Sequence, residues 1–351
     1  MIPYLLSWSF FAAPALSTPR KRLTGASCLA VVLFLTLLIG LRDGVGGDWG
    51  NYLPYLDRVA FLSFSEVLQQ TEPGYALLNW YATQSGGGVY AVNVVCGLIF
   101  SLGLLAFCRS QPRPWLALAL AFPYLVIVVA MGYSRQGVAI GFEMFALLAL
   151  QRDQLLRFLG WIALAATFHR TVLVLLILPA STLSGSLRFS QLIRLALLVG
   201  SAYGLYSAVI APDLDYYVQG YIEAQYQSQG ALIRVALCLL PALLFLLNRR
   251  RFQLSADQQR IWSLIALLAV AAAIGLFTVA SSTAVDRLAL YLIPIQIFVG
   301  SRIPDAALLG LRPPMWNQLL ILFSFAVMIV WLLFAGHSYA WVPYRSVLFQ
   351  I

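Results

Sequence analysis

Charged residues are unusually scarce in this sequence. Only 10% of its 351 residues are charged, whereas a soluble domain of this size usually has about 25%. The hydrophobic share is 61% and the mean hydropathy is +0.85. Apolar segments near the length that crosses a bilayer, about 20 residues, recur along the whole chain. These values exclude a soluble enzyme and predict one integral membrane domain over residues 1–351, all-α, without a separate soluble module.

Several familiar functional signatures are missing. The four cysteines lie inside apolar segments, with no spacing typical of a disulfide framework or a metal site. The chain has two histidines, and no phosphate-binding glycine loop, HExxH, GxSxG or Ser/His/Asp set. The sequence therefore predicts no metal and no cofactor.

Twelve apolar segments are expected to cross the membrane, and some of them are short or broken. They lie at roughly 3–17, 23–41, 89–108, 115–132, 136–150, 156–168, 171–186, 191–211, 231–248, 260–279, 288–303 and 316–336. The first has no basic start and is followed by Arg20, Lys21 and Arg22, which reverses the order of a signal peptide. We therefore expect a retained first helix with an outside N-terminus.

The region 156–186 decides the orientation. As one long span it would place Arg249, Arg250 and Arg251 outside, against the positive-inside rule. Split at His169 into two half-spans, it puts 15 of the 22 basic residues inside with three of the 13 acids. Both termini then lie outside. The formal charge of +9 is consequently an orientation signal and not a nucleic-acid footprint.

Three longer segments fall on the outer side in this topology. Residues 42–88 contain two amphipathic helix candidates, at 52–60 and 75–82, of the kind that lies in the membrane interface. The other two are the loop 212–230 and the C-terminal tail 337–351.

Five polar clusters also fall at outer span ends. They are Asp48 with Asn51, Glu72, Arg135 with Gln136, His169 with Arg170, and Asp286 with Arg287. Charge at or inside a span is costly unless it lines a wet or protein-enclosed cavity. The clusters therefore predict one polar site that opens outward, and their arginines indicate an anionic substrate.

Each cluster has a functional and a structural interpretation. Asp48 and Trp49 follow glycines that let a backbone approach a ligand, and would suit a sugar; the alternative is an interfacial turn. Glu72 is a second site carboxylate or a helix N-cap before Pro73. Arg135 binds phosphate at a helix start or extends to the interface.

The remaining clusters divide in the same way. His169 and Arg170 interrupt an apolar run, where a lone histidine is more often structural but the helix break favours function. Arg287 shares a helix face with Tyr291, or forms a weak local pair with Asp286. Glu143 lies mid-span, as a protonated structural group or a functional acid.

Together these residues resemble the EpsG-type members of the Wzy-like polysaccharide polymerases. The resemblance runs from Arg42 to Tyr291 in matching order. It is carried by Arg42 with Gly46-Gly47-Asp48-Trp49 and Tyr52, by Glu72-Pro73-Gly74-Tyr75, by Arg135-Gln136 with Ala139, by Phe168-His169 with Thr171, and by Arg287-Leu288 with Tyr291. Gly47 replaces a frequent threonine and Arg170 a smaller residue, which affects substrate specificity more than class.

The resemblance implies a multi-span fold similar to the lipid-dependent glycosyltransferases (GT-C-like), in the bacterial inner membrane. Such proteins transfer a growing glycan from undecaprenyl pyrophosphate to a sugar hydroxyl of the next lipid-linked unit, on the periplasmic face and without a nucleotide sugar. Their expected partners are this lipid-linked oligosaccharide, membrane lipid, a flippase and a chain-length regulator, and not nucleic acid.

The resemblance also suggests roles for individual residues. Arg135 and Arg287 would bind the pyrophosphate, and His169 and Arg170 would position the leaving group or acceptor. Asp48 is the expected base, with Glu72 as the alternate. The further substrate contacts expected are Arg42, Trp49, Tyr52, Gln136, Asp286 and Tyr291.

Three other functions fit parts of the pattern. A flippase for the same lipid-linked glycan needs charges on both faces, whereas these concentrate at outer span ends. A ligase that joins glycan to an outer-leaflet acceptor would need the same arginines and histidine. A non-catalytic assembly subunit would have no need for charge at five outer span ends.

Overall fold

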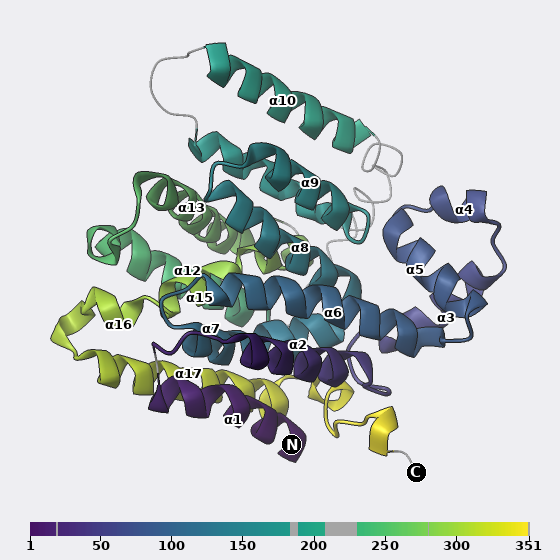
Figure 1. Cartoon of the computed structure of the whole chain (residues 1–351), viewed down its shortest axis with the longest axis horizontal. Coiled ribbons are helices and arrows are strands. Elements are labelled where there is room, and N and C mark those ends of the chain that lie inside the picture. The colour runs from purple at the N-terminus through teal and green to yellow at the C-terminus, as the bar shows by residue number, and fades with distance from the viewer. Residues whose placement is uncertain (19, 183–188, 208–229, 280, 350–351) are drawn as a thin grey trace.

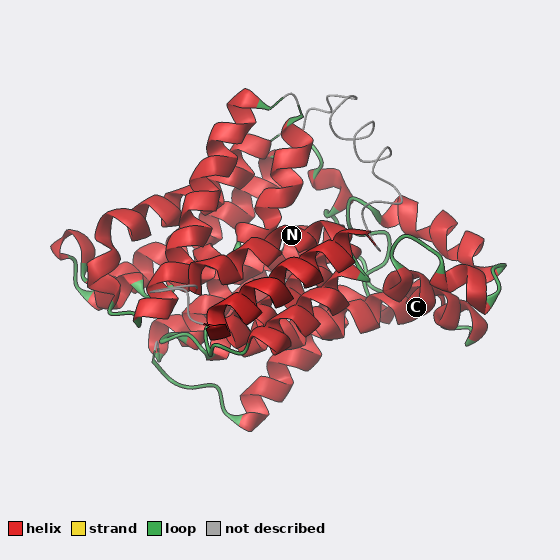
Figure 2. Cartoon of the chain, turned by 90° about the horizontal axis from the view of Figure 1, so that it is seen from above, coloured by secondary structure: helices red, strands yellow, loops and turns green. Residues whose placement is uncertain are grey.

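The computed structural model is helical throughout the part of the chain that it describes, residues 1–18, 20–182, 189–207, 230–279 and 281–349 (Figures 1 and 2). No strand occurs in these ranges, and the extended backbone there pairs once, in an isolated bridge between Arg42 and Ser346. The all-α class is confirmed. The predicted loop 212–230 lies outside the described residues, apart from Gly230.

The helices follow the predicted apolar segments. In the first half they are α1 (Ile2–Ser17), α2 (Gly25–Gly40), α3 (Trp49–Ala60), α4 (Phe64–Leu68), α5 (Pro73–Gln84), α6 (Gly88–Arg109), α7 (Pro114–Ala121), η1 (Phe122–Ala130), α8 (Ser134–Leu150) and α9 (Leu155–Ala166). The rest are η2 (Arg170–Thr182), α10 (Phe189–Leu205), α12 (Ala231–Asn248), η6 (Arg249–Phe252), α13 (Ala256–Thr278), α14 (Ser282–Ala289), η7 (Leu290–Leu292), α15 (Pro294–Gly300), α16 (Ile303–Ala306), η8 (Leu308–Gly310), α17 (Pro313–Phe334), η9 (Ser338–Ala340) and η10 (Val347–Phe349).

Four helical segments are long and apolar enough to cross a membrane. They are Gly88–Arg109, Ala231–Phe252, Ala256–Thr278 and Pro313–Phe334. A fifth is obtained if Ser282–Leu292 and Pro294–Gly300, bent by 43°, count as one span. Shorter apolar helices occupy Gly25–Gly40, Pro114–Ala130, Leu155–Ala166 and Arg170–Thr182. These helices indicate a membrane protein, while twelve crossings and a GT-C-like architecture stay predictions.

The break predicted at His169 is present. Helix α9 ends at Ala166, and the 3₁₀-helix η2 begins at Arg170. Leu155 at the start of α9 and Thr182 at the end of η2 line the same small pocket, so the two helices run antiparallel. At about 2.0 Å rise per residue, a 3₁₀-helix of this length reaches about 26 Å, against about 20 Å for an α-helix. The tighter helix thus brings a short segment close to bilayer thickness, about 30 Å.

The core of the bundle is the helix formed by α7 and η1. All its residues from Pro114 to Ala130 are buried, as expected for a helix that is apolar on every side. It is packed against α1, α6, α8, α15 and α17. The chain then turns at Met131–Tyr133 and starts α8, so the best-packed element of the protein fixes the position of Arg135.

The bundle has two distinct ends. We call the end that holds α3–α5 and the start of α6 the site end, and the end that holds Arg109 and α16 the basic end (Figure 1). Both chain termini lie toward the site end, where the Tyr4 hydroxyl donates a hydrogen bond of 2.7 Å to the carbonyl of Trp341. Termini at one end agree with an even number of crossings.

Candidate functional site

Three of the predicted clusters meet at the buried carboxylate of Glu72. Its Oε1 lies 2.9 Å from His169 Nδ1, and its Oε2 lies 2.7 Å from a guanidinium nitrogen of Arg135. Burial raises the pKa of Glu72, but the hydrogen bond from His169 and the charges of His169 and Arg135 outweigh it, so the pKa lies below its usual value. Glu72 is therefore an anion that holds both partners in place.

The local sequence explains how Glu72 reaches these partners. Glu72 is the N-cap of α5, with Pro73 at the first helical position, as predicted. Its side chain makes no capping bond and extends instead to α8 and the α9–η2 break. The Gly74 amide donates to the Thr167 carbonyl at 3.0 Å, and a Cβ on Gly74 would overlap the Thr167 side chain. Glycine is thus required where α5 meets the break.

The loop that carries Asp48 is wedged between two other segments. Gly46 has a φ of +115°, and a Cβ there would overlap the carbonyl of Met131. The Asp48 amide donates to the Gly132 carbonyl at 3.1 Å. The sequence left open whether these glycines approach a ligand or form a turn, and in the structure Gly46 approaches the protein's own backbone.

The C-terminal tail, residues 337–351, supports this loop, and the sequence did not predict this role. The Gly46 amide donates to the Ala340 carbonyl at 2.8 Å, and the Asp43 amide donates to the Arg345 carbonyl at 3.0 Å. Trp341 is buried, and its indole N–H donates to the Ile127 carbonyl at 2.7 Å. Trp341 is the one tryptophan of this tail, and a large aromatic side chain there is the sequence signal that could have indicated this anchor.

Asp48 differs from Glu72 in its electrostatic surroundings. It is half-buried and accepts a hydrogen bond from Asn51, and it forms no ion pair among the described residues. Burial raises its pKa, and the charges of Arg287 and Arg135 only partly offset this effect. Because a carboxylate with a raised pKa holds a proton more strongly, Asp48 is the better proton acceptor of the two acids.

A second buried ion pair joins α12 to α14. Arg234 binds Asp286 through two hydrogen bonds, Nε to Oδ1 at 2.8 Å and Nη2 to Oδ2 at 2.5 Å. Arg234 was not among the predicted site residues, although an arginine in the first turn of an apolar helix is the same feature that pointed to Arg135. The local Asp286–Arg287 pair offered as an alternative is wrong, because Asp286 points to Arg234.

Arg287 is consequently left facing the site. Its guanidinium lies 5.7 Å from the centroid of the Tyr133 ring, and no hydrogen bond of this guanidinium is found in the described part of the chain. Gln136 donates to the Arg287 carbonyl at 2.8 Å and so joins α8 to α14. Nearby, the hydroxyls of Thr171 and Tyr291 are 3.1 Å apart, and Arg170 is buried.

Arg42, Tyr52 and Trp49 lie beneath the site. Arg42 is fully buried and donates to Ser134 Oγ at 2.7 Å and Asn93 Oδ1 at 3.2 Å. The Tyr52 hydroxyl accepts the Ser134 amide at 2.8 Å, and Arg42 lies over the Trp49 ring. These contacts fix the start of α8, so the substrate contact expected of Arg42 gives way to a supporting role.

The mid-span acid Glu143 lies apart from these groups. It follows Arg135 by eight residues on α8, a rise of about 12 Å. It is buried, and neither carboxylate oxygen has a hydrogen-bond partner among the described residues. It adds no group to the site.

Asp48, Glu72, Arg135, His169 and Arg287 therefore form one polar cluster at the site end. Within the described residues, His169 Nε2 and Gln136 Oε1 are buried without a hydrogen-bond partner. Buried polar atoms normally have partners, so these two atoms are left with unused hydrogen-bonding capacity within the cluster.

The two carboxylates should respond in opposite ways when they are neutralised. We expect Glu72→Gln to lower the free energy of unfolding by about 1–3 kcal/mol, because it leaves charged or polar partners unmatched in a buried place. Asp48→Asn should be neutral or stabilising at pH 7, because folding raises the Asp48 pKa and so disfavours its charged form.

Thermal unfolding of the purified protein in detergent measures both effects. Glu66→Gln, at an exposed N3 position of α4, is the control for loss of one carboxylate charge. Equal unfolding midpoints for Glu72→Gln and Glu66→Gln would contradict the buried ion cluster.

Comparison with known proteins identifies a family for this chain. No curated protein and no solved structure matches the chain. The model of the EpsG family matches residues 26–346, a range that contains every residue of the site and the tail residue Trp341. Because the match covers nearly the whole chain, this protein belongs to the EpsG family.

Proposed function

We propose that this protein polymerises oligosaccharide repeat units carried on undecaprenyl pyrophosphate, by transferring the growing glycan to a sugar hydroxyl of the next lipid-linked unit. Membership in the EpsG family suggests a role as a polysaccharide polymerase of glycosyltransferase type. The observation that carries the finer proposal is the cluster of two acids, two arginines and a histidine at the site end.

The cationic groups suit a pyrophosphate. Arg135 is partly exposed, with 37% of its side chain accessible, although Glu72 holds one of its nitrogens. Arg287 retains its donors for a ligand, as described above. His169 donates through Nδ1 to Glu72, which leaves Nε2 without a hydrogen-bond partner among the described residues. Guanidinium and imidazole N–H donors stabilise the charge that develops on a phosphate leaving group.

The proposed reaction needs one base and one leaving group. Asp48 takes the proton of the acceptor hydroxyl, whose oxygen forms the new bond to the anomeric carbon of the donor glycan. The bond from that carbon to the pyrophosphate oxygen breaks, and the electron pair leaves with the lipid pyrophosphate. Arg135 and Arg287 neutralise this charge, and Glu72 acts as a positioning residue for His169 and Arg135.

An apolar groove supports a lipid-linked substrate. It has a volume of about 530 Å³ and lies between α12 and α17, where Leu237 and Leu240 face Phe323, Val327 and Val330. Arg234 lies in its lining and binds Asp286 next to Arg287. A lipid with its pyrophosphate at Arg287 would extend its chain into this groove, because apolar chains are excluded from the polar cluster.

The orientation follows from the charge distribution. Basic residues gather at the end opposite to the site, and the positive-inside rule assigns that end to the cytoplasm. The site and both termini would then face the periplasm, across the bacterial inner membrane. The expected protein partners are a flippase and a chain-length regulator.

Glycan length tests the polymerase assignment. In a deletion strain complemented with Arg135→Ala at matched protein level, we expect single repeat units in place of long polymer. Arg58→Ala, which removes an exposed arginine on α3, should keep wild-type length.

The accumulated product also separates the competing functions. Intermediates trapped inside would indicate a flippase, and finished polymer left on the lipid would indicate a ligase. Wild-type polymer length with Arg135→Ala would remove Arg135 from the site.

The base assignment has its own test. Asp48→Asn should lower the rate of polymerisation at least 100-fold, because a general base contributes roughly 10²–10⁴-fold. Asp57→Asn, an exposed carboxylate on α3, is the matched control. The assignment is wrong if Asp48→Asn keeps full polymerisation while Glu72→Gln loses it.

Filling the groove tests where the lipid chain lies. Val327→Trp places an indole in the groove, whereas Leu322→Trp changes an exposed position on the same helix. We expect the former to raise the substrate concentration needed for half-maximal polymerisation at least tenfold, and the latter to leave it unchanged. Equal values for the two variants would exclude the groove as the lipid site.

A further inference from the structure

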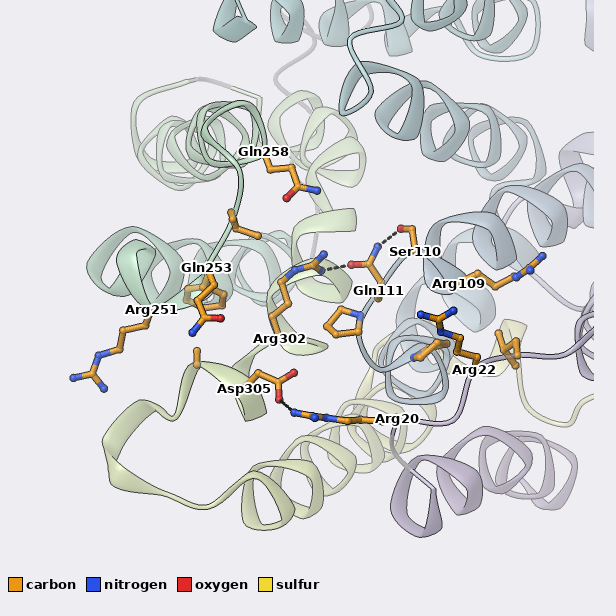
Figure 3. A pocket seen from close by; sticks show the side chains of 16 residues that line it. Arg20, Arg22, Arg109, Ser110, Gln111, Arg251, Gln253, Gln258, Arg302 and Asp305 are labelled. Atoms are coloured by element: carbon orange, nitrogen blue, oxygen red, sulfur yellow. Dashed lines mark hydrogen bonds and ion pairs between the residues drawn. The ribbon is translucent and has the colours of Figure 1, made fainter.

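A second cavity lies at the basic end of the bundle, away from the proposed polymerase site. It has a volume of about 930 Å³ (Figure 3). Its walls come from the segments that connect α1 to α2, α6 to α7, α12 to α13 and α15 to α16. Four separate connections thus enclose one space, which is large enough for a small-molecule ligand, since such pockets are about 300–1,000 Å³.

The lining of this cavity has an excess of positive charge. Five arginines line it, at positions 20, 22, 109, 251 and 302, together with the single acid Asp305. The Asp305 carboxylate is already bound by Arg20, at 2.5 Å, and by the buried Arg113. No carboxylate in the lining therefore balances the other four arginines.

Arg302 lies deepest among these arginines. Its guanidinium lies 3.8 Å from the centroid of the Phe298 ring and donates to the buried side chain of Gln111 and to the Phe298 carbonyl. Burial lowers the pKa of Arg302 to about 9, and the charge of Asp305 only partly offsets this effect. Arg302 is half-buried, and a partly desolvated cation whose only direct partners are neutral gains stability from a bound anion.

Two arginines of the lining are available to such an anion. The side chains of Arg22 and Arg109 form no hydrogen bond or ion pair in the described ranges of the chain. In Figure 3, Arg302 reaches Gln111 in the middle of the cavity and Arg22 points toward the same space from another wall, whereas Arg109 and Arg251 point away from it. The guanidinium fork matches the oxygens of phosphate groups.

Membrane topology alone does not account for this arrangement. The positive-inside rule requires basic residues on one side of the membrane, but not that they share one concave space. Arg152 and Arg157 satisfy that rule at exposed positions outside the cavity. The half-buried Arg302 is costly at such a position unless an anion balances it.

We propose that this cavity binds a phosphate-bearing anion, of about nucleotide size, through Arg22 and Arg302, with Arg109 at its rim. The lining also presents neutral hydrogen-bonding groups, from Ser110, Gln111, Gln253 and Gln258. The phosphate can belong to a soluble molecule or to a lipid headgroup, since the arginines recognise the same oxygens. The proposal is independent of the polymerase assignment, because it concerns the opposite end of the bundle.

The cavity is also connected to the proposed polymerase site through one continuous helix and one bent helical segment. Helix α6 carries Asn93, which binds Arg42, at one end and Arg109 at the other. The segment α14–η7–α15 leads from Arg287 to Arg302. An anion in the cavity would therefore contact two elements that build the site.

Thermal unfolding of the full-length protein in nanodiscs of neutral lipid tests the proposal, with tripolyphosphate and ATP as probes at constant ionic strength. We expect a saturable rise in the unfolding midpoint with at least one probe. The double variant Arg22→Ala, Arg109→Ala should weaken this binding at least tenfold. The control Arg152→Ala, Arg157→Ala removes the same charge from the same end and should bind as the wild type does.

A second arm replaces part of the neutral lipid with phosphatidylglycerol. If that lipid raises the midpoint, competes with the probes and requires Arg22 and Arg109, the phosphate comes from a lipid headgroup. If the probes bind without such competition, the ligand is soluble. An equal loss of binding in both double variants, or no saturable shift with either probes or lipid, would overturn the proposal.

Discussion

The buried carboxylate of Glu72 is the interaction on which the site depends. It accepts from His169 with one oxygen and from Arg135 with the other, and so joins the start of α5, the start of α8 and the α9–η2 break. A buried anion of this kind is stable only while both partners are present. The cost of burying it therefore selects the arrangement in which three distant segments meet, and the proposed chemistry uses the same groups.

The rest of the fold supplies a rigid base for this cluster. The wholly buried α7–η1 helix leads into the turn before Arg135, and Arg42 and Tyr52 both bind Ser134 at the start of α8. The tail closes the arrangement, because Trp341 packs under the loop of Asp48 and binds the central helix. Positioning of the reacting groups to within fractions of an ångström needs such support from packed elements.

The sequence predicted the helical class, the break at His169 and the gathering of the polar clusters, because charge in an apolar chain has few tolerable places. It did not predict which distant residues contact one another. Asp286 binds Arg234, 52 residues away, and Gly46 approaches Met131, and both depend on tertiary packing that local patterns do not encode. The sequence suggested that Arg42 binds a ligand, but its side chain is fully buried. This burial results from the packing of α2, α6 and α8, which the sequence alone does not show.

The most direct test of the account is a reaction with purified components. The protein would be reconstituted with undecaprenyl-pyrophosphate-linked repeat units alone, without a nucleotide sugar, and glycan length and free lipid pyrophosphate would be measured together. The account predicts a ladder of glycans in which each added unit releases one lipid pyrophosphate. Unchanged repeat units in a preparation that remains folded, or a ladder without release of lipid pyrophosphate, would contradict it.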